Sequence, residues 1–282
     1  MVYADRAFSG RIIRPIALGT AGWSFTEGLT HERILDTAAA ALERGPVLID
    51  TAYAYTTLEE QARSDRLVGE VKRHGGDDVM ISAKGGHYRD ATGFPIDGRP
   101  ETIRRHAEAS LQAMGVEAVE LYSLHRVDPR VPIEDSIGAI DDLRREGKVH
   151  HVGVSNVSLD QLRAAAGVTQ IAAVQNRFSP YVRDSLDVVE EVHETGMLFL
   201  AYSPTKPGPD TPPALVEAIR KIATYRRISP QQVALAWTMW ITAVPIIGST
   251  RRATVEDSFG ALDVVFETDE LEWIESASSV TH

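Results

Sequence analysis

The sequence predicts an α/β protein of the (β/α)8 type, a TIM barrel, in a single domain over residues 1–282. Short runs rich in Val, Ile, Leu and Ala recur, and each precedes a longer segment with helical periodicity. The runs are almost continuously apolar, as in parallel strands buried on both faces. A chain of 282 residues suits two small domains or one barrel, and the lack of a Pro/Gly/Ser-rich linker favours one.

The strand candidates follow one another from the first residues to the last quarter of the chain. Parallel strands need long crossovers, so helices between them imply a sheet covered by helices, and eight such units close naturally into a barrel. The candidates are 16–20 (IALGT), 47–50 (VLID), 79–84 (VMISAK), 119–125 (VELYSLH), 151–156 (HVGVSN), 172–176 (AAVQN), 198–203 (LFLAYS) and 243–249 (AVPIIGS).

The segments between these runs carry helix start and stop signals. Pro100 suits a first turn and Gly115 a helix end, while Ser229 with Gln232 three residues later forms a capping-box pattern. One helical stripe is formed by Ile133, Ile137, Ile140 and Leu143. Residues 205–213 (TKPGPDTPP) indicate a loop that follows a strand.

Composition excludes several function classes. Lys plus Arg 29 against Asp plus Glu 40 gives a net charge of −11, which argues against nucleic acid or an anionic membrane as partner. The absence of Cys excludes disulfides and thiolate chemistry, and no partnered His or Cys pattern predicts a metal site. The first residues lack the apolar core of a signal peptide, so we expect a cytoplasmic protein, with a monomer as the default.

Familiar nucleotide-binding loops are missing from the sequence. No G-x-G-x-x-G follows an early strand, since GTAG after the first strand lacks the third glycine, and no Walker A loop is present. A doubly wound dinucleotide-binding domain is therefore disfavoured.

Polar residues stand where several predicted strands end, and in a barrel this end carries the active site. Asp50, Lys84 and His125 end the second, third and fourth strands, and Tyr55 follows Asp50 by five residues. Each alone has an ordinary structural explanation, as a helix cap, a rim charge, a core histidine or a packing aromatic. Together they suit acid catalysis, because an ammonium beside a phenol is expected to lower its pKa by roughly one to three units. A carboxylate would hold the lysine charged, and the histidine could hydrogen-bond the reacting oxygen.

These residues resemble the aldo-keto reductase family, whose members are (β/α)8 barrels with an Asp-Tyr-Lys-His tetrad and a nicotinamide dinucleotide. The matching motifs run nearly end to end: DTAYAY, ISAKGG, YSLHRVD, EGKVHHVGVSN, AVQNRFSP, AYSP, QVALAW and PIIGST. The resemblance implies a catalytic tetrad of Asp50, Tyr55, Lys84 and His125. Tyr55 would protonate the carbonyl oxygen of an aldehyde or ketone while hydride arrives from the nicotinamide.

The same resemblance implies the cofactor contacts. The nicotinamide would be held by Ser155, Asn156, Gln175 and Tyr202, the pyrophosphate by Ser203 and Lys206, and the adenosine 2′-phosphate by Ser249, Thr250, Arg251 and Arg252. Two adjacent arginines favour NADPH over NADH, and the weaker alternative is a solvated basic turn on an acidic protein.

Some positions depart from the family pattern. Thr205, Lys206 and Pro207 replace a glycine-bearing stretch, and Asp257 with Ser258 stands where Glu-Asn usually meets adenine. The chain ends soon after TDELEWIESASS, without the long arm of some relatives, so an open pocket is expected. Candidates for its wall include Trp23, Ser24, Tyr53, His87, Tyr88, Arg126 and Phe178.

Three functions stay open from the sequence. The first is NADPH-dependent carbonyl reduction. The second is a Schiff-base barrel enzyme that uses Lys84, which leaves Asp50 and the carboxamide contacts unexplained. The third is a non-enzymatic subunit that senses NADPH, which the intact tetrad disfavours.

Overall fold

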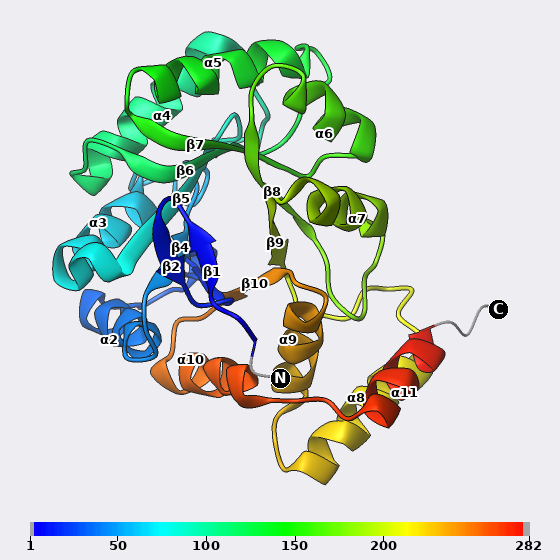
Figure 1. Ribbon diagram of the computed structural model, residues 1–282. Coiled ribbons are helices and arrows are strands. Elements are labelled where there is room, and N and C mark those ends of the chain that lie inside the picture. Colours follow the sequence, from blue (N-terminus) through cyan, green and yellow to red (C-terminus); the bar gives the residue numbers. More distant parts are fainter. Residues whose placement is uncertain (1–2, 279–282) are drawn as a thin grey trace.

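A computed structural model describes residues 3–278 of the chain (Figure 1). Eight parallel strands close into a barrel in the order β10-β3-β4-β5-β6-β7-β8-β9. The strands are β3 (Ala17–Gly19), β4 (Val47–Asp50), β5 (Val79–Gly85), β6 (Val119–Leu124), β7 (Val149–Ser155), β8 (Ile171–Arg177), β9 (Leu198–Tyr202) and β10 (Val244–Gly248). The predicted (β/α)8 barrel is confirmed, and every predicted strand is present to within two residues at each end.

Helices surround the barrel on its outer side (Figure 1). They are α1 (Ala21–Phe25), α2 (His31–Leu42), α3 (Arg63–Gly75), α4 (Pro100–Met114), α5 (Ile133–Arg145), α6 (Leu159–Ala166), α7 (Leu186–Thr195), α8 (Pro213–Arg226), α9 (Pro230–Trp240), α10 (Arg252–Phe259) and α11 (Thr268–Ser278). A large apolar cluster fills the layer between strands and helices. Within residues 3–278, no helix combines the length and the hydropathy needed to span a bilayer.

The helix caps show why these segments begin and end where they do. The hydroxyl of Ser229 accepts from the backbone N–H of Gln232 at 3.1 Å, which confirms the predicted N-cap of α9. The other half of the predicted capping box is absent, because the Gln232 amide donates instead to Asp257. Gly115 ends α4 with a positive φ of 69°, a conformation that glycine adopts without the steric cost of a side chain.

A hairpin that the sequence analysis missed closes the amino-terminal end of the barrel. It consists of β1 (Arg6–Phe8) and β2 (Arg11–Ile13), with Ser9 and Gly10 both at positive φ in the turn, as a two-residue hairpin loop requires. In Figure 1 it lies across the barrel opening. Its buried side chains join an inner cluster of Leu48, Met80, Leu121, Leu200 and Val244. Apolar packing therefore fills the amino-terminal end of the barrel, and the polar residues lie at the carboxyl end of the strands.

Candidate active site

The four predicted catalytic residues lie at one rim of the barrel. Asp50 is the last residue of β4, Lys84 lies in β5, and His125 directly follows β6. These three strands are direct neighbours in the barrel. Tyr55 lies on the loop between β4 and α3, and its carbonyl oxygen accepts from the Ser24 hydroxyl at 2.7 Å. The barrel end and one anchored loop together bring the four side chains into one site.

Lys84 and Asp50 form a buried ion pair at the centre of this site. Nζ of Lys84 lies 2.7 Å from Oδ2 of Asp50 and donates to the carbonyl oxygen of Thr51 at 2.8 Å. Oδ1 of Asp50 accepts from the Ser82 hydroxyl at 3.0 Å and from Nε2 of Gln175 at 2.8 Å. Burial lowers the pKa of Lys84, but Asp50 and Tyr55 together outweigh that effect and hold it above its usual 10.5. The ammonium therefore stays charged.

Tyr55 extends over this ammonium. Nζ of Lys84 lies 5.1 Å from the centre of the Tyr55 ring, and the ring of His125 stands nearly perpendicular at 5.8 Å. Burial raises the pKa of the Tyr55 phenol above its usual 10.0, and the Lys84 charge lowers it by less. The predicted lowering of this pKa by the ammonium is present, but lost hydration is the larger effect and the net shift is upward. At neutral pH the phenol keeps its proton, and Lys84 reduces the cost of releasing it.

His125 is neutral in this setting. Burial lowers its pKa well below 6.5, and the positive charges of Lys84 and Arg126 lower it further. Its Nδ1 is buried and has no hydrogen-bond partner among the described residues. The other histidine at the rim, His87, stands edge-on to it at 4.8 Å. A neutral imidazole can donate one hydrogen bond to an oxygen at this rim without adding a second charge beside Lys84.

A cavity of about 600 Å³ opens beside these residues. Asp50, Tyr55 and His125 are among its lining residues, and so are Ser249 and Ser258. A hollow of about 730 Å³ lies at the opposite end of the barrel, but its lining contains none of the predicted catalytic residues. The catalytic cluster and the long cavity together identify the carboxyl end of the barrel as the candidate active site.

The residues predicted to hold a nicotinamide all line this cavity, but they also bond to one another. Asn156, at a positive φ of 56°, donates to the Ser155 hydroxyl and to the carbonyl oxygen of His125, each at 3.0 Å. The Tyr202 hydroxyl donates to Oδ1 of Asn156 at 2.7 Å. Gln175 bonds to Asp50, so the amide-binding group and the ion pair form one network. The sequence analysis did not predict this link.

The predicted phosphate and adenine residues divide into two groups. Five of them line the cavity: Ser203, Lys206, Ser249, Thr250 and Ser258. Arg251, Arg252 and Asp257 are not among its lining residues. Arg252 instead bonds to the carboxylates of Asp36, Glu43 and Glu256, and Asp257 accepts from Ser229 and Gln232. For these two residues the predicted cofactor contact is not supported, since local partners already occupy their polar groups.

The predicted substrate wall needs corrections as well. Trp23 is fully buried and donates from Nε1 to the carbonyl oxygen of Ser249 at 2.9 Å, so it is a core residue. Tyr53 stacks on His106 at 4.0 Å, outside the cavity lining. Phe178 is likewise fully buried, against Phe199 and Trp237. His87 lies beside His125, and Arg126 lines the cavity directly.

Two phenylalanines that no sequence motif singles out lie near the site, outside the residues that line the cavity. Phe25 and Phe94 are exposed, 6.0 Å apart, and Phe25 lies 6.4 Å from the Tyr55 ring. Arg89 lies over both phenylalanines and donates to the carbonyl oxygen of Thr56 at 2.9 Å. Neither phenylalanine belongs to a periodic pattern, so their positions could not be predicted from the sequence.

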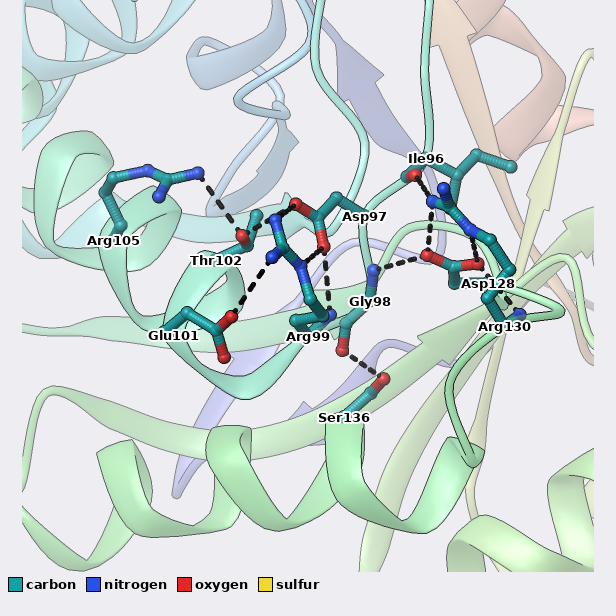
Figure 2. Close-up of polar contacts among 10 residues, drawn as sticks. All are labelled: Ile96, Asp97, Gly98, Arg99, Glu101, Thr102, Arg105, Asp128, Arg130 and Ser136. Atoms are coloured by element: carbon teal, nitrogen blue, oxygen red, sulfur yellow. Dashed lines mark hydrogen bonds and ion pairs between the residues drawn. The ribbon is translucent and has the colours of Figure 1, made fainter.

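Two aspartate–arginine pairs fasten the loop that carries Phe94 (Figure 2). Asp97 bonds to Arg99, and Asp128 bonds to Arg130. Asp128 also accepts from the backbone N–H of Gly98 at 3.1 Å, which joins the loop after β5 to the loop after β6. These bonds lower the pKa of Asp128 to about 2. The end of the loop that carries Phe94 is therefore anchored to the loop after β6.

Within residues 3–278, no cluster of His, Asp or Glu suits a metal ion.

The chain is similar to known proteins of one family along most of its length. The model of the aldo/keto reductase family matches residues 15–279. The chain is 29% identical to probable aldo-keto reductase 1 of Glycine max, over 92% of this chain and 87% of that protein. An aldo-keto reductase of Schizosaccharomyces pombe whose name specifies NADP(+) is 29% identical, over 66% of each chain. The crystal structure of a Klebsiella pneumoniae aldo-keto reductase in complex with NADPH superimposes with a TM-score of 0.82 at 22% identity, covering 99% of this chain and 96% of that one.

Proposed function

Because this chain belongs to the aldo/keto reductase family, we propose that it reduces an aldehyde or ketone with NADPH and that Tyr55 is the general acid. The observation that carries the proposal is the buried pair of Lys84 and Asp50, 2.7 Å apart, beneath a phenol that keeps its proton. When bound, the dinucleotide supplies the hydride. The residues described below supply the proton, the orientation and the electrostatic stabilisation.

Tyr55 would donate its proton to the carbonyl oxygen as negative charge develops there. The phenolate left behind is stabilised by the Lys84 ammonium, whose charge Asp50 maintains. The neutral His125 would donate a hydrogen bond to the same oxygen and orient it toward Tyr55. A charged imidazole at this position would repel Lys84, so the lowered pKa of His125 suits this role.

NADPH is the preferred cofactor in this proposal. The names of the Schizosaccharomyces pombe and Klebsiella pneumoniae relatives specify NADP(+) and NADPH. The cavity is long, and its lining carries hydroxyl groups and one lysine, Lys206, which suit phosphate oxygens. Arg252 is bound to three carboxylates. Arg251 forms no ion pair within residues 3–278, so we assign the 2′-phosphate to Arg251 with Ser249 and Thr250.

The Schiff-base alternative is disfavoured by the state of Lys84. A nucleophilic amine must be neutral and accessible, whereas this Nζ is fully buried, bonded to Asp50 and held above its usual pKa. Tight NADPH binding without turnover would instead favour the sensing subunit.

We further propose that residues 1–282 act as one domain and as a cytoplasmic monomer. Sedimentation well above the 30.9 kDa chain mass would contradict the monomer.

The decisive experiment compares the wild type with Tyr55→Phe. We expect kcat/KM for a neutral aldehyde to fall about 10²- to 10⁴-fold, because the proton donor is lost. The dissociation constant for NADPH, measured by fluorescence titration, should stay within about threefold of the wild type. Tyr225→Phe is the matched control, since Tyr225 is 86% exposed on α8. Activity of Tyr55→Phe within tenfold of wild type would show that another group donates the proton.

A further inference from the structure

Arg126 is the one guanidinium among the described residues that line the catalytic cavity. It directly follows His125, and its side chain is exposed. Burial is the main cause of the lowered pKa values of His125 and His87 and of the raised pKa of Tyr202, and the charge of Arg126 acts on all three as a smaller, lowering effect. The guanidinium therefore lies within electrostatic range of aromatic groups from β6, from the loop after β5 and from β9.

No carboxylate neutralises this guanidinium. Arg126 forms no ion pair in the described part of the chain, whereas many other arginines of this acidic protein have an aspartate or glutamate partner. Asp50 is the only acid among the described residues that line the cavity, and Lys84, Gln175 and Ser82 already occupy its oxygens. The mouth of the cavity thus presents an unpaired positive charge although the net charge is −11.

The position of Arg126 favours a substrate over the cofactor as its partner. The residues assigned to the nicotinamide and the phosphates come from the ends of β7, β8, β9 and β10. Arg126 belongs to the loop after β6, next to the histidine that orients the carbonyl oxygen. A group bound by Arg126 would therefore lie within a few bonds of the reacting carbonyl carbon.

We propose that Arg126 binds an anionic group of the substrate, so that the preferred carbonyl compounds carry a carboxylate or a phosphate. A guanidinium binds both groups through paired, charge-assisted N–H donors. Phe25 and Phe94 supply an apolar wall on the Tyr55 side of the site. This inference rests on the proposed function and adds a substrate class to it.

The test compares pairs of aldehydes in which one member is anionic and the other is neutral. One pair is 4-carboxybenzaldehyde and 4-formylbenzamide, and the other is glyceraldehyde 3-phosphate and glyceraldehyde. We expect kcat/KM to favour the anionic member of at least one pair by roughly ten- to hundredfold, the range of one charge-assisted hydrogen bond. The first pair reports a carboxylate preference and the second a phosphate preference. In Arg126→Gln the ratio should fall to near one, and Arg126→Lys should restore part of it.

Arg73→Gln is the control, because Arg73 is exposed on α3 and does not line the cavity. A wild type that reduces the neutral aldehydes but prefers neither anion overturns the inference and leaves the proposed function intact. An Arg126→Gln variant that loses activity equally on both members, with weaker NADPH binding, assigns Arg126 to the cofactor and also overturns it. If no aldehyde is reduced, the proposed function fails. Calorimetric titration of 4-carboxybenzaldehyde then decides the inference alone, and equal affinity of the wild type and Arg126→Gln refutes it.

Discussion

Replacing Asp50 with asparagine keeps the shape of the side chain but leaves the Lys84 ammonium buried without its countercharge. The Lys84 and Asp50 side chains are 0% and 4% exposed, so water can screen little of the loss. Removing one partner of a buried ion pair costs about 3–5 kcal/mol. Asparagine can still accept from Ser82 and Gln175, so we expect the free energy of unfolding to fall by about 3 kcal/mol at neutral pH.

The dependence of this loss on pH identifies its cause. In the wild type the pKa of Lys84 in the folded protein lies above its usual 10.5. The stability that the charged Lys84 contributes is therefore fully present below about pH 10.5 and is lost as the pH rises through the folded pKa. In Asp50→Asn, burial becomes the main effect and lowers the pKa of Lys84. The variant should therefore gain stability as the pH rises toward about 10, and the gap to the wild type should narrow.

Urea unfolding followed by circular dichroism between neutral and alkaline pH measures both effects. Asp65→Asn is the control, because Asp65 is also fully buried but accepts hydrogen bonds from the hydroxyls of Thr51 and Ser110. Burial raises the pKa of Asp65, so removing its charge should cost less than removing that of Asp50. The double variant Asp50→Asn/Lys84→Met should be more stable than Asp50→Asn alone. A loss under 1 kcal/mol, or one equal at all pH values, would refute the buried-pair reasoning.

The remaining predictions concern the cofactor end and the loop anchor. Arg251→Gln should raise the dissociation constant for NADPH about tenfold, the loss of one charge-assisted bond, whereas Arg252→Gln should change it less than threefold because Arg252 is bound to Asp36, Glu43 and Glu256. Fluorescence titration measures both, and a larger effect at Arg252 would reverse our assignment. The folded pKa of Asp128 is about 2, so its contribution to stability is present above its unfolded pKa and is lost as the pH falls toward 2. In Asp128→Asn the urea midpoint should therefore change less between about pH 4 and 2 than it does in the wild type. The same dependence of the midpoint on pH in both proteins would contradict this.

The strands were predictable because burial on both faces leaves a clear apolar signal, as in VLID from Val47 to Asp50. Three of the predicted catalytic residues, Asp50, Lys84 and His125, were predictable for the same reason, since each ends such a run, and Tyr55 follows Asp50 on the next loop. The hairpin of β1 and β2 was not, because each of its strands is an arginine followed by only two apolar residues. Phe25, at the end of α1, comes close to Tyr55 and to Phe94 only in the folded chain, and no local pattern specifies these contacts.

Charge and burial were harder to predict than position. The sequence shows that Arg252 is basic, but not that α2 and α10 place carboxylates around it. It shows that Lys84 can approach Tyr55, but not that burial of the phenol outweighs the ammonium. Trp23 was assigned to the cavity wall from its place after the first barrel strand, and its depth in the core became visible only in three dimensions.

The closure of the barrel has a consequence for how the protein is made. The ring is completed when β10, near the end of the chain, pairs with both β3 and β9. Until the ribosome has released this last strand, the nascent polypeptide exposes two unpaired strand edges that can associate with other chains. A transcript cut short before Val244 would therefore yield an aggregation-prone product and not a smaller working enzyme.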